Sequence, residues 1–235
     1  MAKNKATIPE KPQFYGRRKG HPLRPHRQQL MNELLPKLVI SPDSSEPLDP
    51  LTLFEDKSDI WLEIGFGAGE HLAAQAAANP AIGFIGCEPY INGVATLLSV
   101  IEREELSNIR LYSDDARMLL DQITPASISK VFVLFSDPWP KTRHHRRRFI
   151  NPENLDALAR IMKEGAEFRF ATDDMSFLRW SLNEFYHHPD FNWLAEGPDN
   201  WRLRYADAAP TRYETKALKQ GKKCVYLTFQ RQVRK

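Results

Sequence analysis

The sequence predicts an α/β protein with a mostly parallel, seven-stranded sheet, helices on both of its faces and an antiparallel C-terminal edge hairpin. Two observations support this. From residue 59 onward, short apolar runs typical of buried strands alternate with segments of helical period. Such repeated strand–helix units favour a parallel sheet. Two late strands, 191–194 and 223–229, have no predicted helix between them and therefore predict the hairpin.

The first 57 residues predict a basic arm, a short helix and a proline-rich loop, whereas residues 58–235 predict the domain that carries the chemistry. Residues 1–20 are polar and broken by proline and glycine, which is typical of a loosely ordered arm. Apolar residues at helical spacing predict a helix over 27–38. Pro42, Pro47 and Pro50 then predict a surface loop up to about residue 57.

The repeated part is expected to contain five strands before the hairpin, at 60–64, 82–87, 109–112, 131–135 and 167–171. The helices between and after them are expected at 70–78, 90–104, 116–123, 151–164 and 176–187. Asn79-Pro80 ends the first of these helices. Asn151 at the cap and Pro152 in the first turn begin the fourth, which is predicted to stop at Gly165.

The distribution of charge matters more than its total. The net charge is only +3, but the first forty residues hold nine Lys or Arg against two acids. A second basic concentration follows residue 140, and the middle of the chain is more acidic. This pattern suits a body that binds a small ligand while its rim contacts a polyanion. Arg17 and Arg18 lie in an aromatic and cationic segment, 14–21, of a kind that stacks on bases and pairs with phosphates.

Several other classes of protein are not expected. No apolar run approaches the length of a membrane span, and the basic N-terminus has no apolar core of a secretory signal, so a cytoplasmic protein is predicted. Cys87 and Cys224 lie inside predicted strands and are expected to be small buried hydrophobes. No Cys or His cluster has metal-binding spacing, so no metal is expected.

A glycine-rich loop, Gly65, Gly67 and Gly69, lies between the first strand and the first helix. Glycines there allow a sharp turn and close approach of a ligand. The pattern is shared by dinucleotide dehydrogenases and S-adenosylmethionine enzymes. Glu70 at the helix start would repel a pyrophosphate, and Glu63 at the strand end suits the ammonium and sulfonium charges of adenosylmethionine. The second cofactor is therefore favoured.

Acids stand at the ends of four successive strands. After Glu63 come Glu88, placed to grip a ribose diol, Asp115, placed for an adenine amino group, and Asp137. Each alone could be a helix cap or a solvated loop residue. Because the carboxyl ends of parallel strands meet at one edge, the four together predict a ligand site there.

The stretch that follows the fourth strand begins Asp137-Pro138-Trp139-Pro140 and then carries five cations within eight residues. An acid at a strand end followed at once by clustered cations indicates chemistry on nucleic acid. The alternative is a solvated basic loop. The five cations are Lys141, Arg143, Arg146, Arg147 and Arg148.

With these motifs, the chain resembles the bacterial tRNA (guanine-N7)-methyltransferases of the class I, Rossmann-like superfamily from about residue 14 to 229. The segment 137–148 is similar to the family's D-P-W-x-K-x-R-H-x-x-R-R signature, and 63–69 to its cofactor motif. Residues 171–173 and 211–214 resemble two later substrate motifs. One departure is Ala68, where many members carry Asn.

The resemblance implies S-adenosylmethionine as cofactor, tRNA as substrate and 7-methylguanosine at position 46 of the variable loop as product. It implies cofactor contacts at Glu63, Glu88, Asp115 and Asp137. It implies tRNA contacts at Lys141, Asp173, Thr211, Arg212, Tyr213 and Glu214. The arginines at 143 and 146–148 are expected on tRNA phosphates.

Guanine N7 has a lone pair and no proton, so its methylation needs alignment and no general base. A carboxylate beside the ring would stabilise the positive charge that the purine gains, and Asp137 is the candidate catalytic residue. Asp173 or Glu214 could read the donors on the other guanine edge, and the sequence does not separate them. Asp173 could equally be a helix cap.

Three other functions are compatible with parts of the sequence. An amino-methyltransferase acting on adenine N6 or cytosine N4 uses a related motif at the same strand end. A nicotinamide-dependent oxidoreductase shares the glycine pattern, and an RNA-binding module could keep a degenerate domain of this kind. Whether the protein is a monomer or a homodimer is left open by the sequence.

Overall fold

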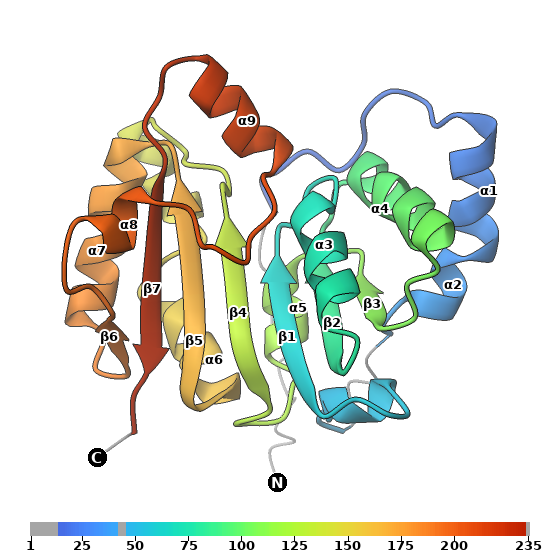
Figure 1. Ribbon diagram of the computed structural model, residues 1–235, viewed down its shortest axis with the longest axis horizontal. Coiled ribbons are helices and arrows are strands. Elements are labelled where there is room, and N and C mark those ends of the chain that lie inside the picture. The colour runs from blue at the N-terminus through green and yellow to red at the C-terminus, as the bar shows by residue number, and fades with distance from the viewer. Residues whose placement is uncertain (1–13, 42–45, 234–235) are drawn as a thin grey trace, which may run out of the picture.

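The computed structural model describes residues 14–41 and 46–233 of the chain (Figure 1). The described residues form a seven-stranded sheet in the order β3-β2-β1-β4-β5-β7-β6. β7 is antiparallel to both of its neighbours, and the other strands share one direction. The predicted sheet and its antiparallel edge hairpin are therefore confirmed. The strands are β1 Asp59–Ile64, β2 Ile82–Cys87, β3 Ile109–Tyr112, β4 Ile128–Leu134, β5 Met162–Thr172, β6 Phe191–Trp193 and β7 Val225–Arg231.

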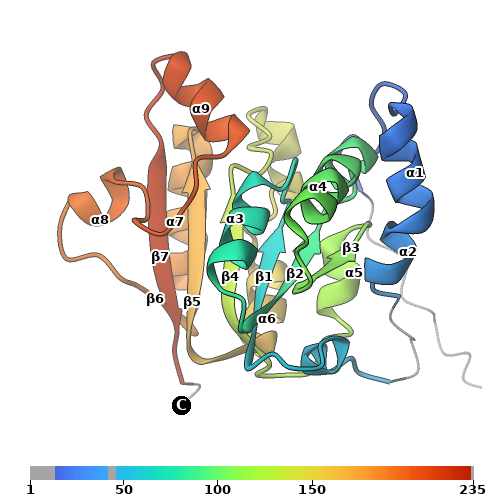
Figure 2. The same ribbon diagram turned by 45° about the vertical axis from the view of Figure 1, so that its right-hand side comes forward.

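Helices cover both faces of the sheet (Figures 1 and 2). On one face, α5, α6 and α7 bury their apolar sides, with Leu119, Leu158 and Phe177 fully enclosed. On the other, α3 and α4 pack together with α1 and α2. Burying these two apolar faces is the main favourable term for folding. The helices are α1 Pro25–Glu33, α2 Leu35–Leu38, α3 Glu70–Ala78, α4 Ile91–Glu104, α5 Ala116–Leu120, α6 Pro152–Ile161 and α7 Met175–His187.

The prediction that no helix lies between the last two strands was wrong. The chain between β6 and β7 forms two helices, α8 Asp199–Arg202 and α9 Arg212–Lys219. α9 begins with a capping box, in which the Thr211 hydroxyl accepts from the Glu214 N–H and the Glu214 carboxylate accepts from the Thr211 N–H. α9 spans only eight residues, and five of them are polar or charged, so no apolar run marks it in the sequence.

The predicted end of α6 at Gly165 was also wrong. The helix stops at Ile161, and β5 already begins at Met162. Pairing between β4 and β5 shifts register between the Ile128–Met162 pair and the Lys130–Glu167 pair. Gly165, with φ of +74°, lies within this irregularity. The glycine therefore permits a bulge in a strand and does not cap a helix.

The described part of the N-terminal arm is anchored to the start of α4, contrary to the loose arm that was predicted. The Ile91 N–H donates to the Arg18 carbonyl at 3.0 Å, and the Gly20 N–H donates to Asn92 Oδ1 at 2.8 Å. Arg18 pairs with Asp114 at 2.7 Å. The predicted arm before residue 14 lies outside the described residues. The single helix predicted over 27–38 is interrupted at Leu34, between α1 and α2.

In the part of the chain that the structure describes, no helix is long and apolar enough to span a membrane. The same residues hold no cluster of three or more His, Cys, Asp or Glu side chains that could bind a metal ion.

Candidate active site

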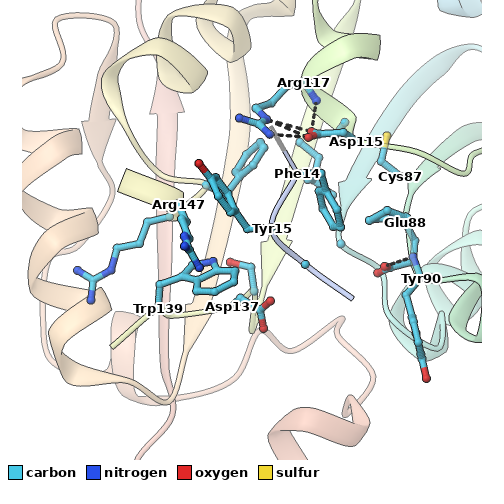
Figure 3. A pocket seen from close by; sticks show the side chains of 18 of the residues that line it. Phe14, Tyr15, Cys87, Glu88, Tyr90, Asp115, Arg117, Asp137, Trp139 and Arg147 are labelled. Carbon is cyan, nitrogen blue, oxygen red and sulfur yellow. Dashed lines mark hydrogen bonds and ion pairs between the residues drawn. The ribbon is translucent and has the colours of Figure 1, made fainter. Parts of the chain in front are cut away.

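A cavity of about 420 Å³ opens at the carboxyl ends of β1, β2 and β4 (Figure 3). Its walls come from the glycine loop, the end of β2, the start of α5, residues 135–139, residues 146–149 and the arm residues 14–17. Tyr213, in the first turn of α9, also lines it. The topology thus brings most of the predicted strand-end residues to one place, as expected for an open α/β sheet.

The glycine loop is held tightly against α4 and α9. Gly67 has φ of +60°, and a side chain there would reach within 3.0 Å of the Tyr213 ring. A Cβ at Gly93, in α4, would lie 2.1 Å from the Gly67 carbonyl oxygen. Neither position has room for a larger residue. The loop backbone is therefore open toward the cavity, where a ligand can approach it closely.

Glu88 supports that loop from the end of β2. Its carboxylate accepts from the Gly67 N–H at 2.8 Å and from the Tyr90 N–H at 2.9 Å. Burial raises the pKa of the Glu88 carboxyl, and the negative charges of Asp137 and Glu63 add to this rise, while the two N–H groups oppose it. A buried carboxylate in the wall of a ligand cavity is typical of a functional site.

The raised pKa of Glu88 predicts a dependence of stability on pH. The folded protein binds this proton more tightly than the unfolded chain, so the contribution of Glu88 to stability is present at low pH. It is lost as pH rises from the ordinary carboxyl range, about 4.3, through the raised pKa. The free energy of unfolding of the wild type should therefore fall over this window relative to that of Glu88→Gln. Chemical denaturation at a series of pH values checks this, and parallel curves would contradict it.

Glu63 does not line the cavity. It is buried at the end of β1, and its carboxylate lies 2.7 Å from Nδ1 of His71, which is buried in the first turn of α3. The His71 ring also packs edge-on against Phe132. His71 was not singled out from the sequence, although its place directly after the glycine loop was visible. Gly69 also lies outside the wall and forms the N-cap of α3 with φ of +82°.

Asp115 lines the cavity, but its carboxylate is already engaged. It accepts from the Arg117 N–H at the start of α5 and pairs with the Arg117 guanidinium at 2.6 Å. Asp115 is therefore the N-cap of α5, as the sequence allowed, and its predicted cofactor contact stays a prediction. A ligand amino group would have to share this carboxylate with Arg117.

Asp137 faces the same cavity from the loop after β4 (Figure 3). Its side chain is exposed, yet the surrounding protein excludes enough water to raise the pKa of the carboxyl. Among the described residues, no donor lies within hydrogen-bond distance of this carboxylate. It is thus an acid that a ligand or substrate can use.

Arg148 does not fit its predicted phosphate contact, because the residue is only 1% exposed. Its Nε donates to the Pro138 carbonyl at 2.8 Å and its Nη2 donates to Ser176 Oγ at 3.0 Å. The guanidinium lies 5.3 Å from the ring centroids of both Phe177 and Trp180. Arg148 therefore fixes the loop that follows Asp137.

The neighbouring cations have different surroundings. Lys141, Arg143 and Arg146 are exposed and available to a polyanion. Arg17 and Arg18 on the arm are exposed as well, but Arg18 is paired with Asp114 and Arg17 donates to the Lys19 carbonyl. Arg147 instead lies against two aromatic rings of the cavity wall, those of Tyr15 and Trp139. The cationic segment 142–147 is a 3-10 helix, which sends consecutive side chains in different directions.

The later substrate motifs are only partly at the cavity. Glu214 is buried, belongs to the capping box and accepts from the Tyr226 hydroxyl at 2.5 Å, so it is committed within the protein. Asp173 pairs with Lys222 at 2.5 Å and does not line the cavity. The cap of α7 is Asp174.

A second cavity of about 150 Å³ lies on the other side of the glycine loop, where Gly67 and Tyr213 line both cavities. Arg27 from α1 and Arg212 from α9 bring positive charge to it. Arg212 was predicted as a substrate contact and lies here, whereas Arg27 was not singled out because its partners in the wall are distant in sequence.

Comparison with known proteins identifies the family. A family model described as "Putative methyltransferase" matches residues 57–227. The tRNA (guanine-N(7)-)-methyltransferase of Rhodospirillum rubrum is 49% identical over 97% of this chain and 92% of its own length. That of Ruegeria pomeroyi is 49% identical over 96% and 98%. The chain belongs to the tRNA (guanine-N7)-methyltransferase family.

Solved structures agree with the fold of this family. An rRNA methylase from Streptococcus thermophilus superposes with a TM-score of 0.52 at 12% identity, covering 77% of this chain and 91% of its own. The antibiotic-resistance methyltransferase Kmr superposes with a TM-score of 0.53 at 14% identity, covering 77% and 90%. The predicted Rossmann-like class I methyltransferase fold is confirmed.

As a member of this methyltransferase family, the protein uses S-adenosylmethionine. The residues of the larger cavity fit that group. Its volume of about 420 Å³ lies in the range of cofactor sites. Gly65 and Gly67 leave backbone exposed in the wall, and Glu88, Asp115 and Asp137 supply carboxylates suited to diol, amino and sulfonium groups.

Proposed function

We propose that this protein transfers a methyl group from S-adenosylmethionine to N7 of guanine at position 46, in the variable loop of tRNA, and forms 7-methylguanosine. The observation that carries the proposal is the Asp137 carboxylate. It faces the cavity between the glycine loop and the exposed cations of residues 141–146, in a chain 49% identical to curated tRNA (guanine-N(7)-)-methyltransferases. We further propose that it acts in the cytoplasm.

Two tasks are assigned to residues of the cavity. Gly65, Gly67 and Glu88 hold the cofactor, which when bound supplies an electrophilic methyl group on a sulfonium. Asp137 stabilises the positive charge that develops on the purine as N7 is methylated. No residue needs to remove a proton, because N7 carries none. The contribution of the protein is to hold the base in line with the methyl group and to exclude water.

Selection of guanine was predicted to use Asp173 or Glu214. Glu214 is enclosed by its capping box and Tyr226, which favours Asp173. The Asp173 side chain is 24% exposed and is held by a lysine that is itself 50% exposed. A base edge could replace that lysine at modest cost, since such surface pairs contribute at most about 1 kcal/mol. The role of Asp173 stays a prediction.

The exposed arginines of the segment after Asp137 are expected to contact tRNA phosphates. Replacing both Arg143 and Arg146 by Gln should reduce the slope of log affinity against log salt by about 0.7 to 0.9 for each phosphate that is no longer neutralised. Filter binding of tRNA at several salt concentrations measures the slope. Arg103→Gln, at the far end of α4 from the cavity, is the control and should leave it unchanged. An unchanged slope in the double variant would mean that these side chains are only solvated.

The decisive experiment is methyl transfer from labelled adenosylmethionine to unmodified tRNA, followed by mass analysis of the nucleosides. The expected product is 7-methylguanosine, and a tRNA with adenine in place of guanine 46 should accept no label. N6-methyladenosine or N4-methylcytidine would show an amino-methyltransferase instead. Binding of tRNA without transfer, in a protein that binds adenosylhomocysteine, would indicate an RNA-binding module.

The division of the chain at residue 57 stays a prediction. Leu30 and Leu38, from α1 and α2, share a buried cluster with Leu97 and Leu98 of α4. We therefore propose that α1 and α2 belong to the methyltransferase domain and that only the arm before them is an extension of it.

A further inference from the structure

One wall of the larger cavity contains an aromatic pair, Tyr15 from the arm and Trp139 from the loop after β4 (Figure 3). The two ring centroids are 6.5 Å apart and the rings are inclined by 74°. The Arg147 guanidinium lies against both rings, 4.1 Å from the Tyr15 centroid and 4.9 Å from that of Trp139. A planar cation thus lies in contact with both aromatic rings.

Little other than the rings holds this cation. Among the described residues, no carboxylate lies within salt-bridge distance of Arg147, and its Nε is buried without a hydrogen-bond partner. The adjacent Arg148 is different, because it donates to both a carbonyl and a hydroxyl. A buried donor without a partner costs free energy. Arg147 is therefore a side chain that another planar group could replace.

The backbone around Trp139 shows that the ring position is imposed by its surroundings. Trp139 has φ of +43°, a left-handed conformation that is unfavourable for a bulky residue. Such conformations persist only where neighbouring contacts enforce them, and they gather at functional sites. Here the Arg148 guanidinium holds the preceding carbonyl, that of Pro138. The Trp139 ring is thereby placed in the cavity wall that also includes Asp137.

We propose that Tyr15 and Trp139 form the subsite for the methyl-accepting purine, and that this subsite prefers the cationic, N7-methylated ring to the neutral one. Arg147 occupies the subsite until the base enters. The inference rests on the proposed function. Its chemistry follows from charge: N7-methylated guanine is a planar cation, as a guanidinium is, and both are attracted to aromatic faces.

This subsite would serve the reaction as well as binding. The purine gains positive charge as the methyl group arrives, so contact with the ring faces strengthens along the reaction path. Interactions that are stronger in the transition state than in the ground state are those that raise kcat. Tyr15 and Trp139 would act on the purine face while Asp137 acts from the same cavity.

The test compares binding of two nucleosides, guanosine and 7-methylguanosine, to the full chain saturated with adenosylhomocysteine. Nucleosides carry no phosphate, so arginine–phosphate contacts do not enter. Equilibrium dialysis should show that the wild type binds 7-methylguanosine about 2- to 30-fold more tightly, the range expected for a cation–π contact. Trp139→Leu and Tyr15→Leu should each reduce the ratio toward one, and Trp139→Phe should restore part of it.

Controls distinguish the loss of a ring contact from a loss of folded structure. Trp193→Leu, on the edge strand β6, should keep the wild-type ratio. Unchanged affinity for adenosylhomocysteine shows that a variant is folded, and Tyr15→Leu, on the arm, carries the test if Trp139→Leu does not fold. Arg147→Ala removes the guanidinium from the Tyr15 and Trp139 rings and should raise the affinity for both nucleosides about 2- to 5-fold.

A ratio of one in the wild type, or a ratio that survives both Leu variants, would overturn the proposal. So would weaker binding by Arg147→Ala. None of these measurements requires turnover. They can therefore fail while methyl transfer to tRNA succeeds, and the two proposals are judged separately.

Discussion

Replacing Asp137 by Asn is expected to lower kcat for methylation of tRNA by about 30- to 1,000-fold, equivalent to about 2–4 kcal/mol of transition-state stabilisation. The Asp137 carboxylate faces the cavity with no donor in reach among the described residues, so its charge is available to the purine. Asn keeps the shape and removes the charge. Single-turnover kinetics with saturating cofactor and tRNA measures the chemical step directly.

The control for this variant is Asp121→Asn, at the end of α5 away from the cavity, which should keep wild-type kinetics. Affinities for adenosylhomocysteine and tRNA, measured on the same samples, show which step the charge serves. If turnover and both affinities were unchanged in Asp137→Asn, the role assigned to this carboxylate would be wrong.

Replacing Arg148 by Lys is expected to lower the free energy of unfolding by about 2–4 kcal/mol. A lysine keeps the charge but has all its donors on one nitrogen, whereas Arg148 reaches the Pro138 carbonyl and Ser176 Oγ from two different nitrogens. A lysine also loses the flat contact with Phe177 and Trp180. Because the Pro138 carbonyl directly precedes Trp139, kcat should fall as well. Chemical denaturation measures the first effect and single-turnover kinetics the second.

Arg143→Lys is the matched control, since Arg143 is exposed on the same segment and surface replacements usually change stability by less than about 0.5 kcal/mol. If Arg148→Lys kept wild-type stability and instead reduced the salt dependence of tRNA binding, the phosphate contact first predicted for Arg148 would be supported.

The fold could be predicted because its strands are short apolar runs separated by helices of clear period. The errors arose where two signals compete. Gly165 was interpreted as a helix end, but its positive φ serves a bulge in β5. The missed helix α9 begins at Thr211 and Glu214, which were assigned to a family motif, although the same Thr-x-x-Glu spacing is also the signature of a helix start.

The site could be predicted as a set of residue types, but the partners of each residue could not. Arg147 and Arg148 are adjacent residues of the same type in one cationic run. Yet Arg147 lies against the aromatic rings of the cavity, whereas Arg148 is buried and donates hydrogen bonds within the protein. Glu63 and His71 are joined only once α3 has packed on the sheet. Such pairings depend on three-dimensional packing, which periodicity and spacing do not encode.

The position of β7 in the sheet has a consequence for how the protein is made. β6 pairs only with β7 within the described residues, and β7 also covers the edge of β5. A ribosome completes α7, β6, α8 and α9 before it reaches β7. Until then, the growing chain carries an uncovered β5 edge, which is the kind of surface that joins wrongly with other chains. Premature termination within the last strand would leave that edge open permanently, so shortened products should aggregate and not accumulate as folded protein.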